Sequence, residues 1–96
     1  LTEACIGAHL INTVDDSCGV HYWRESPNEV DFVLRDARRL TAIEVKSGRR
    51  SSHVAGLTAF CDAFRVTRRL IVGDAPGCDV SIAEFLSEPA SHWTDV

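Results

Sequence analysis

The chain has 96 residues, of which 45% are hydrophobic and 25% charged, and a formal net charge of -4. This length allows one domain with one modest core, and this composition is normal for a soluble globular protein. The acidic balance argues against a protein that binds nucleic acid by bulk electrostatics, although local basic patches can still form. No apolar run approaches the length of a membrane span, and no secretory signal pattern is present.

The first quarter of the chain predicts a helix, a loop and a strand. Residues 1–13 carry apolar side chains at helical spacing, namely Leu1, Ala4, Ala8 and Ile11, widened by Cys5 and Leu10. Turn-forming residues follow over 14–19, and residues 20–24 are typical of a short aromatic strand. Glu3 is either a solvated acid in the first helical turn or a carboxylate aimed at a site.

Residues 29–46 predict a hairpin of two strands. Apolar and polar residues alternate on both sides of a polar turn at 36–39. A symmetric hairpin across that turn places Asp31 opposite Glu44, with Lys46 on the same face as Glu44. Two carboxylates this close can be stable if a divalent cation lies between them. The alternative is an amphipathic strand with its charged side in water.

The remaining residues predict a helix, a strand and a short C-terminal addition. The polar loop at 47–52 carries Arg49 and Arg50, which suit either phosphate binding or a plain solvated loop. Residues 53–64 predict a helix, and residues 67–72 predict a strand that is buried on both faces. Ser81 and Glu84 form a capping box before a short helix, and residues 87–96 are expected to be a tail anchored by Trp93.

The four cysteines are Cys5, Cys18, Cys61 and Cys78. None belongs to a C-x-x-C pair or has a histidine at zinc-finger spacing, which indicates a reduced, cytoplasmic protein without structural zinc. Cys5 and Cys61 fall on apolar positions of the expected helices, so we expect both in the core.

The predicted order is helix-strand-strand-strand-helix-strand, which gives an α/β fold with a mixed sheet between helices. The first three strands are expected to be antiparallel. The fourth follows a helical crossover, so it is expected to run parallel to the strand before that helix or to another strand of its direction.

This order, with Asp31 and the triplet Glu44-Val45-Lys46 on the central strands, resembles the PD-(D/E)XK nuclease superfamily. A closer resemblance is to domain of unknown function 4143, the C-terminal domain of prokaryotic AAA-type ATPases. It is carried by Glu3 to Asn12, Tyr22-Trp23-Arg24, Glu29-Val30-Asp31-Phe32-Val33, Ile43-Glu44-Val45-Lys46-Ser47 and Gly56-Leu57-x-x-Phe60.

The resemblance implies a restriction-endonuclease-like core, with residues 1–96 forming one nuclease-like domain at the C-terminal end of a longer ATPase. The missing initiator Met agrees with such a fragment. The sequence contains no G-x-x-x-x-G-K-[ST] motif, so the P-loop is expected upstream.

The superfamily also implies roles for individual residues. Asp31, Glu44 and the Val45 carbonyl would hold Mg²⁺, or Mn²⁺ in its place, with the Glu3 carboxylate beside them. Asp31, Glu44 and Lys46 would be the catalytic residues, and Lys46 would orient the attacking water. Two features depart from the family pattern: Val30 stands where the superfamily has Pro, and Glu29 is an extra acid.

Three functions remain open from the sequence. The first is a Mg²⁺-dependent nuclease that cuts or binds DNA. Its expected further partner is the upstream ATPase, no membrane partner is expected, and a homo-oligomer is compatible with this interpretation. The second is a catalytically inactive regulatory or docking domain, with an apolar patch expected around Phe85, Leu86 and Trp93. The third is a DNA-binding module without cleavage that uses the arginines Arg49, Arg50, Arg65, Arg68 and Arg69.

Overall fold

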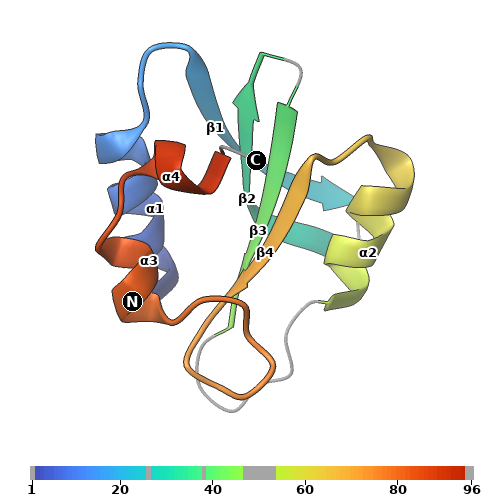
Figure 1. Ribbon diagram of the computed structural model, residues 1–96. Helices are drawn as coiled ribbons and strands as arrows, with labels where there is room; N and C mark the ends of the chain where they lie inside the picture. Colours follow the sequence, from blue (N-terminus) through green and yellow to red (C-terminus); the bar gives the residue numbers. More distant parts are fainter. Residues whose placement is uncertain (1, 26, 38, 47–53, 95–96) are drawn as a thin grey trace.

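The computed structural model describes residues 2–25, 27–37, 39–46 and 54–94. The elements in chain order are α1 (Thr2–Thr13), β1 (Cys18–Glu25), β2 (Asn28–Asp36), β3 (Arg39–Val45), α2 (Val54–Ala63), β4 (Arg68–Val72), α3 (Ile82–Leu86) and α4 (Ala90–Thr94). The predicted order is confirmed up to β4, and Figure 1 shows the mixed α/β architecture that results.

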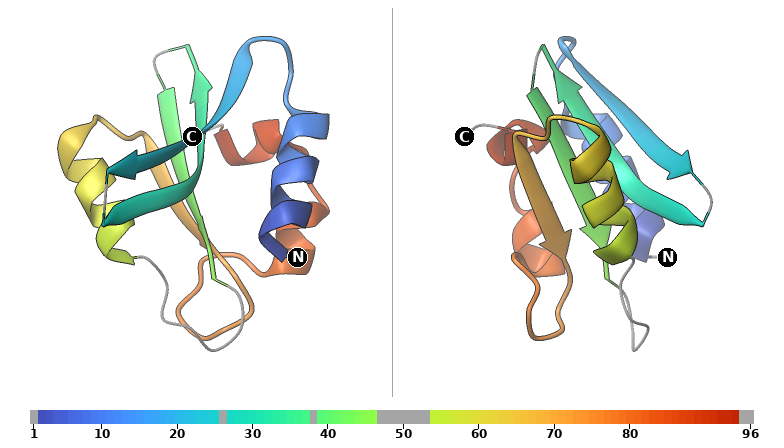
Figure 2. Two further views of the ribbon diagram at one scale, coloured as in Figure 1. Left: turned by 180° about the vertical axis from the view of Figure 1, so that it is seen from behind. Right: turned by 90° about the vertical axis from the view of Figure 1, so that its right-hand side faces the viewer.

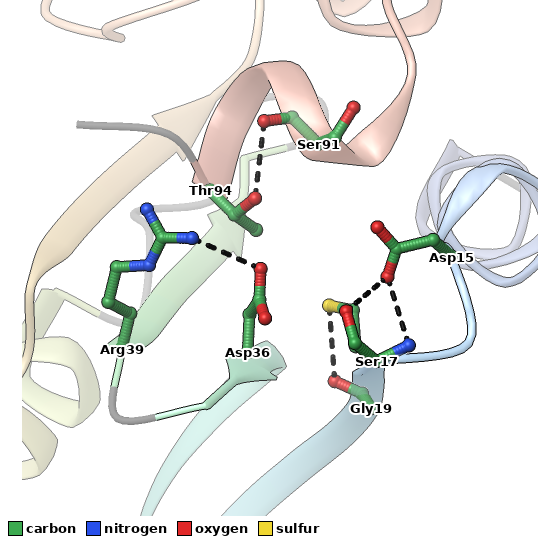
Figure 3. Close-up of polar contacts among 8 residues, drawn as sticks. Asp15, Ser17, Gly19, Asp36, Arg39, Ser91 and Thr94 are labelled. Atoms are coloured by element: carbon green, nitrogen blue, oxygen red, sulfur yellow. Dashed lines mark hydrogen bonds and ion pairs between the residues drawn. The ribbon is translucent and has the colours of Figure 1, made fainter.

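The four strands form one open sheet in the order β1-β2-β3-β4. β1, β2 and β3 are antiparallel neighbours, whereas β3 and β4 are parallel because α2 carries the chain across the sheet between them. The predicted hairpin register is confirmed from Asp36 opposite Arg39 to Phe32 opposite Ile43. The turn is closed by an ion pair of 3.2 Å between Asp36 and Arg39, shown in Figure 3.

Helices cover both faces of the sheet, as Figures 1 and 2 show. α2 packs on one face against a small apolar cluster that includes Val30, Val33 and Leu57. α1, α3 and α4 lie on the other face over the larger cluster, which includes Ile43 and Phe85. β3 is buried on both faces from Thr41 to Val45 because it is an inner strand with a helical layer on each side.

The exposure of α1 differs from the prediction. Its buried residues are Ile6, Gly7 and Leu10, whereas the predicted stripe is exposed at Ala4, Cys5, Ala8 and Ile11. The helix is apolar on two sides, and the side with Ile6 and Leu10 fills the space above the sheet better than small alanines would. An apolar stripe on α1 therefore faces away from the protein.

The C-terminal segment forms part of the core. Ser81 caps α3 by accepting a hydrogen bond from the Glu84 N–H at 3.1 Å, so this predicted cap is confirmed. Residues 87–96 are not simply a tail, because α4 forms and buries Trp93 against Phe85 with ring centroids 5.2 Å apart.

The predicted docking patch is therefore wrong. Phe85 is 0% exposed and Trp93 is 3% exposed, so both belong to the core, and of the three residues only Leu86 reaches the surface. Arg68 also serves this packing, since it donates a hydrogen bond of 3.3 Å to the Trp93 carbonyl and lies over the Trp93 ring.

Two helices at opposite ends of the chain are joined by hydrogen bonds. The Thr13 hydroxyl donates to the His9 carbonyl at 2.7 Å and accepts from the Ala90 N–H at 2.9 Å. An imidazole nitrogen of His9 lies 2.6 Å from the Glu88 carbonyl. These contacts satisfy the backbone groups at the end of α1 and at the start of α4, and they fix the position of α4.

All four cysteines are free thiols. The prediction that Cys5 and Cys61 are core residues is wrong, because Cys5 is exposed and Cys61 is half-buried. Burial raises the pKa of the Cys18 thiol above its ordinary value of 9.0, and the nearby carboxylates Asp36 and Asp15 add to the effect. Asp15 itself is held in the turn before β1 by hydrogen bonds from Ser17, drawn in Figure 3.

We expect Cys18 to be alkylated by iodoacetamide more slowly than Cys5 between about pH 7 and pH 9, because the thiolate is the reactive form. Because the pKa of Cys18 is raised, its thiolate fraction at any given pH is smaller than that of a thiol with the ordinary value. Mass spectrometry of each site against pH measures this. Denaturation in urea is the control and should equalise the two rates, while equal rates in the native protein would contradict the assignment.

Candidate functional site

The candidate site lies where β2 turns away from β3. The β2–β3 ladder ends at Phe32 opposite Ile43, although β3 continues to Val45 and β2 begins at Asn28. Figure 1 shows the first part of β2 beginning near α2 alongside the end of β1, and its second part running beside β3. Backbone groups at this divergence lose their strand partner and need another one.

A bulge in β2 causes the divergence. His21 of β1 pairs with Val33, but Trp23 pairs with Val30, so two residues of β2, Asp31 and Phe32, face a single residue of β1. Bulges bend a strand and redirect its side chains. The predicted alternation of β2 is accordingly broken, since Val30 and Val33 share one cluster whereas Phe32 packs with the other.

Asp31 and Glu44 bridge the diverging strands. The Asp31 carboxylate accepts a hydrogen bond from the Val45 N–H at 2.8 Å, and the Glu44 carboxylate accepts one from the Asp31 N–H at 3.4 Å. Each acid thus satisfies a backbone donor of the opposite strand. Glu44 is 0% exposed, whereas Asp31 is half-buried.

Two glycines hold β2 in this path. A Cβ on Gly56 of α2 would lie 2.1 Å from the Glu29 carbonyl oxygen, and a Cβ on Gly7 of α1 would lie 3.0 Å from the Phe32 ring. One helix therefore contacts β2 on each side of Asp31, which fixes the backbone that carries the carboxylate.

A hollow of about 240 Å³ opens beside Asp31 and is lined by Glu3, Tyr22, Trp23, Arg24, Glu29, Val30 and Asp31. Glu3, on the first turn of α1, and Asp31 therefore border the same space. At the rim, Arg24 forms an ion pair of 3.1 Å with Glu29. Glu29, the extra acid in the comparison with the superfamily pattern, is thus engaged with an arginine.

The remaining predicted residues are less closely tied to this hollow. The Lys46 N–H donates to the Val72 carbonyl at 2.8 Å, one residue beyond the end of β3. That its side chain shares the face of Glu44 stays a prediction. Within the residues that the structure describes, the Lys46 ammonium forms no ion pair. Arg49 and Arg50 lie outside the described residues.

The carboxylates gather as a pair at the divergence. Among the described residues, no group of three or more His, Cys, Asp and Glu side chains is placed to hold a metal ion. Mg²⁺ is commonly held by one or two carboxylates and keeps several waters. Asp31 and Glu44 are hard oxygen donors of that kind, and Glu3 borders the same hollow as Asp31.

A second hollow of about 460 Å³ was not anticipated from the sequence. It lies on the α2 face and shares Tyr22 and Trp23 with the hollow beside Asp31. Its aromatic lining includes Phe60 on α2 and Phe64 immediately after the helix. The two residues are four apart in sequence, so their side chains lie on the same side. That spacing, next to Arg65, is the sequence signal that could have indicated it.

Comparison with known proteins identifies one family. The family model described as "Domain of unknown function (DUF4143)" matches residues 1–77. The match includes the whole of α1, the sheet and the candidate site. No curated protein and no solved structure matches this chain. None of the helices in the described part of the chain has the length and apolarity that a membrane crossing requires.

Proposed function

The chain belongs to the family of domain of unknown function 4143, and from this premise we propose that it is a nuclease-like domain that cleaves or binds DNA by metal-assisted phosphodiester hydrolysis. The observation that carries the proposal is the interlocking of Asp31 and Glu44 across the divergence of β2 and β3. The order of helix, three strands, helix and strand supports our further proposal that the core is restriction-endonuclease-like. We further propose that the domain belongs to a longer AAA-type ATPase.

The donor set fits Mg²⁺ or Mn²⁺. Asp31 and Glu44 would hold the ion with the Val45 carbonyl, and Glu3 would hold an associated water from the other side of the hollow. When bound, the ion would lower the pKa of a coordinated water and neutralise charge that develops on the phosphate. Fixed backbone hydrogen bonds to both carboxylates favour a defined position for these ligands.

The chain's own residues would then carry the remaining steps. Lys46 would orient the water for attack on phosphorus. The Val45 N–H would hold the Asp31 carboxylate in place by donating a hydrogen bond to it. The water oxygen would bond to phosphorus and give up a proton to solvent, one P–O ester bond would break, and the leaving oxygen would take up a proton. Arg49 and Arg50 would contact the phosphate backbone through charge-assisted hydrogen bonds from their guanidinium groups.

Calorimetric titration with Mg²⁺ and with Mn²⁺ tests the metal site. We expect binding heat with the native chain. In Glu44→Gln and Glu44→Ala we expect the metal affinity to fall at least about tenfold, as is usual when a group around a metal is changed. Glu44→Gln preserves the side-chain volume and an acceptor for the Asp31 N–H, so it separates charge from folding. An absence of heat, or equal heat in the variants, would contradict the metal site.

A regulatory or docking domain is the second candidate function. It is favoured by the outward stripe of α1, where Ile11 is 66% exposed beside the exposed residues Ala4, Cys5 and Ala8. If this stripe binds the ATPase portion, Ile11→Asp should weaken their association when the two parts are mixed. Unchanged association would remove the support for docking through α1, and Thr58→Asp on the exposed side of α2 is the matched control.

A further inference from the structure

The larger hollow, on the α2 face, has an aromatic wall. The ring centroid of Trp23 lies 5.3 Å from that of Phe60 and 6.3 Å from that of Phe64, and the two phenylalanine rings lie 4.8 Å apart. Phe64 is 45% exposed and Tyr22 is 77% exposed, so part of this aromatic surface is open to solvent. Exposed aromatic surface in a hollow of about 460 Å³ suits a planar ligand.

Both charged residues that line this hollow, within the part of the chain that the structure describes, are cationic. Arg35 and Arg65 border it and are exposed, and no Asp or Glu is among the described lining residues. Among the described residues, neither guanidinium forms a hydrogen bond or an ion pair. A local positive edge on a chain with a net charge of -4 favours an anionic ligand at this place.

We propose that the hollow lined by Trp23, Phe64, Arg35 and Arg65 binds a single-stranded nucleic acid, with a base stacked on the aromatic rings and neighbouring phosphates held by the two arginines. Stacking platforms flanked by basic side chains are the usual way in which proteins hold single strands. A duplex fits this chemistry poorly, because its bases are already stacked on one another. The inference rests in part on the proposed nuclease function, which supplies a nucleic acid as substrate.

The position of the hollow fits that role. Tyr22 and Trp23 border both this hollow and the smaller one beside Asp31. A strand that places a base against Trp23 would therefore lead its backbone toward the hollow beside Asp31. The hollow would select an unpaired strand and direct it to the cleavage site.

Binding can be measured without cleavage, in EDTA. We expect a labelled oligothymidine of about 10 nucleotides to bind the chain, and Phe64→Ala to weaken binding about tenfold by removing a stacking surface. Arg65→Ala should weaken binding and make the salt dependence shallower by about 0.7 in log–log slope. Arg69→Ala removes the same charge from an exposed residue of β4 outside the hollow and should have little effect. Quenching of the native tryptophan fluorescence should disappear in Trp23→Phe, because Trp93 is buried in the other core.

Several results would overturn the inference. They are equal binding by native chain and Phe64→Ala, an equal loss in Arg65→Ala and Arg69→Ala, binding of duplex as tight as single strand, or displacement of the strand by polyglutamate at equal concentration. Because Arg65 is exposed, Arg65→Ala should keep the native melting temperature. Phe64→Ala also removes contacts with Trp23 and Phe60, so its binding is measured well below its own melting temperature. Strand binding in EDTA without cleavage in Mg²⁺ would sustain this inference and count against the nuclease, whereas cleavage unaffected by Phe64→Ala would do the reverse.

Discussion

Replacing Gly56 by alanine is expected to lower the free energy of unfolding by about 3 kcal/mol, the upper end for inserting a group into a packed contact. In a helix, alanine is normally better than glycine by about 1 kcal/mol. Here the added Cβ would lie 2.1 Å from the Glu29 carbonyl oxygen and 2.8 Å from its nitrogen. The atoms that the Cβ would meet belong to the Glu29 backbone, which cannot rotate aside as a flexible side chain can, so α2 or β2 must shift.

Urea denaturation measures this change, with Thr58→Ala as the control on the exposed side of the same helix. The control should unfold close to the native midpoint. A native or higher midpoint for Gly56→Ala would show that α2 does not approach β2 as closely as described. Because Glu29 is two residues from Asp31, residual folded Gly56→Ala should also bind Mn²⁺ more weakly.

Replacing Phe85 by alanine is expected to cost about 3–5 kcal/mol, the usual range for a buried aromatic residue. Phe85 is 0% exposed, stacks on Trp93 at 5.2 Å and meets the edge of the His9 ring at 5.9 Å. Its removal would leave a cavity between α1, α3 and α4. Since a small domain has only about 5–15 kcal/mol of total stability, the variant should be largely destabilised.

Thermal denaturation followed by near-ultraviolet circular dichroism tests this prediction, because the Trp93 signal reports the same packing. Leu86→Ala, the adjacent but exposed position, is the control and should shift the midpoint little. If Phe85→Ala and Leu86→Ala melted together near the native temperature, Phe85 would be a surface residue and the docking patch would regain its basis.

Local chemistry made the central hairpin predictable from the sequence. The polar turn and the alternation on both sides determine one register, and the observed pairs follow it from Asp36 opposite Arg39 to Phe32 opposite Ile43. Ser81 with Glu84 identified a helix start through a hydrogen bond between near neighbours. The helix between β3 and β4 dictated a parallel pair.

Features that depend on distant packing were not predictable in the same way. The bulge at Asp31 arises from the pairing of β2 with β1, so the alternation of β2 alone does not reveal it. Periodicity predicted that α1 is a helix but did not show which side faces the sheet, because two of its sides carry apolar residues. The short α4 forms because Trp93 and Ala90 are buried, which a five-residue pattern cannot indicate.

The candidate site was predicted in part for the same reason. Asp31 and Glu44 were expected to face each other, and they do meet at the end of the predicted ladder, although through backbone hydrogen bonds. The aromatic hollow combines Trp23 of β1 with Phe60 of α2 and Phe64 just beyond it. Strands β2 and β3 lie between Trp23 and these two phenylalanines in the sequence. Only the folded chain brings those rings together.

The most direct test of the proposed function is nicking of supercoiled plasmid in Mg²⁺ and in Mn²⁺, by this chain and by the longer ATPase to which we propose it belongs, with ATP supplied. The account predicts nicking that falls about 100-fold or more in Lys46→Ala, a loss typical of a group that positions a proton-transfer step. Lys46→Ala should still bind Mn²⁺, because its ligands are unchanged. No nicking by either native protein, or equal nicking by Lys46→Ala, would contradict the account and favour the docking domain.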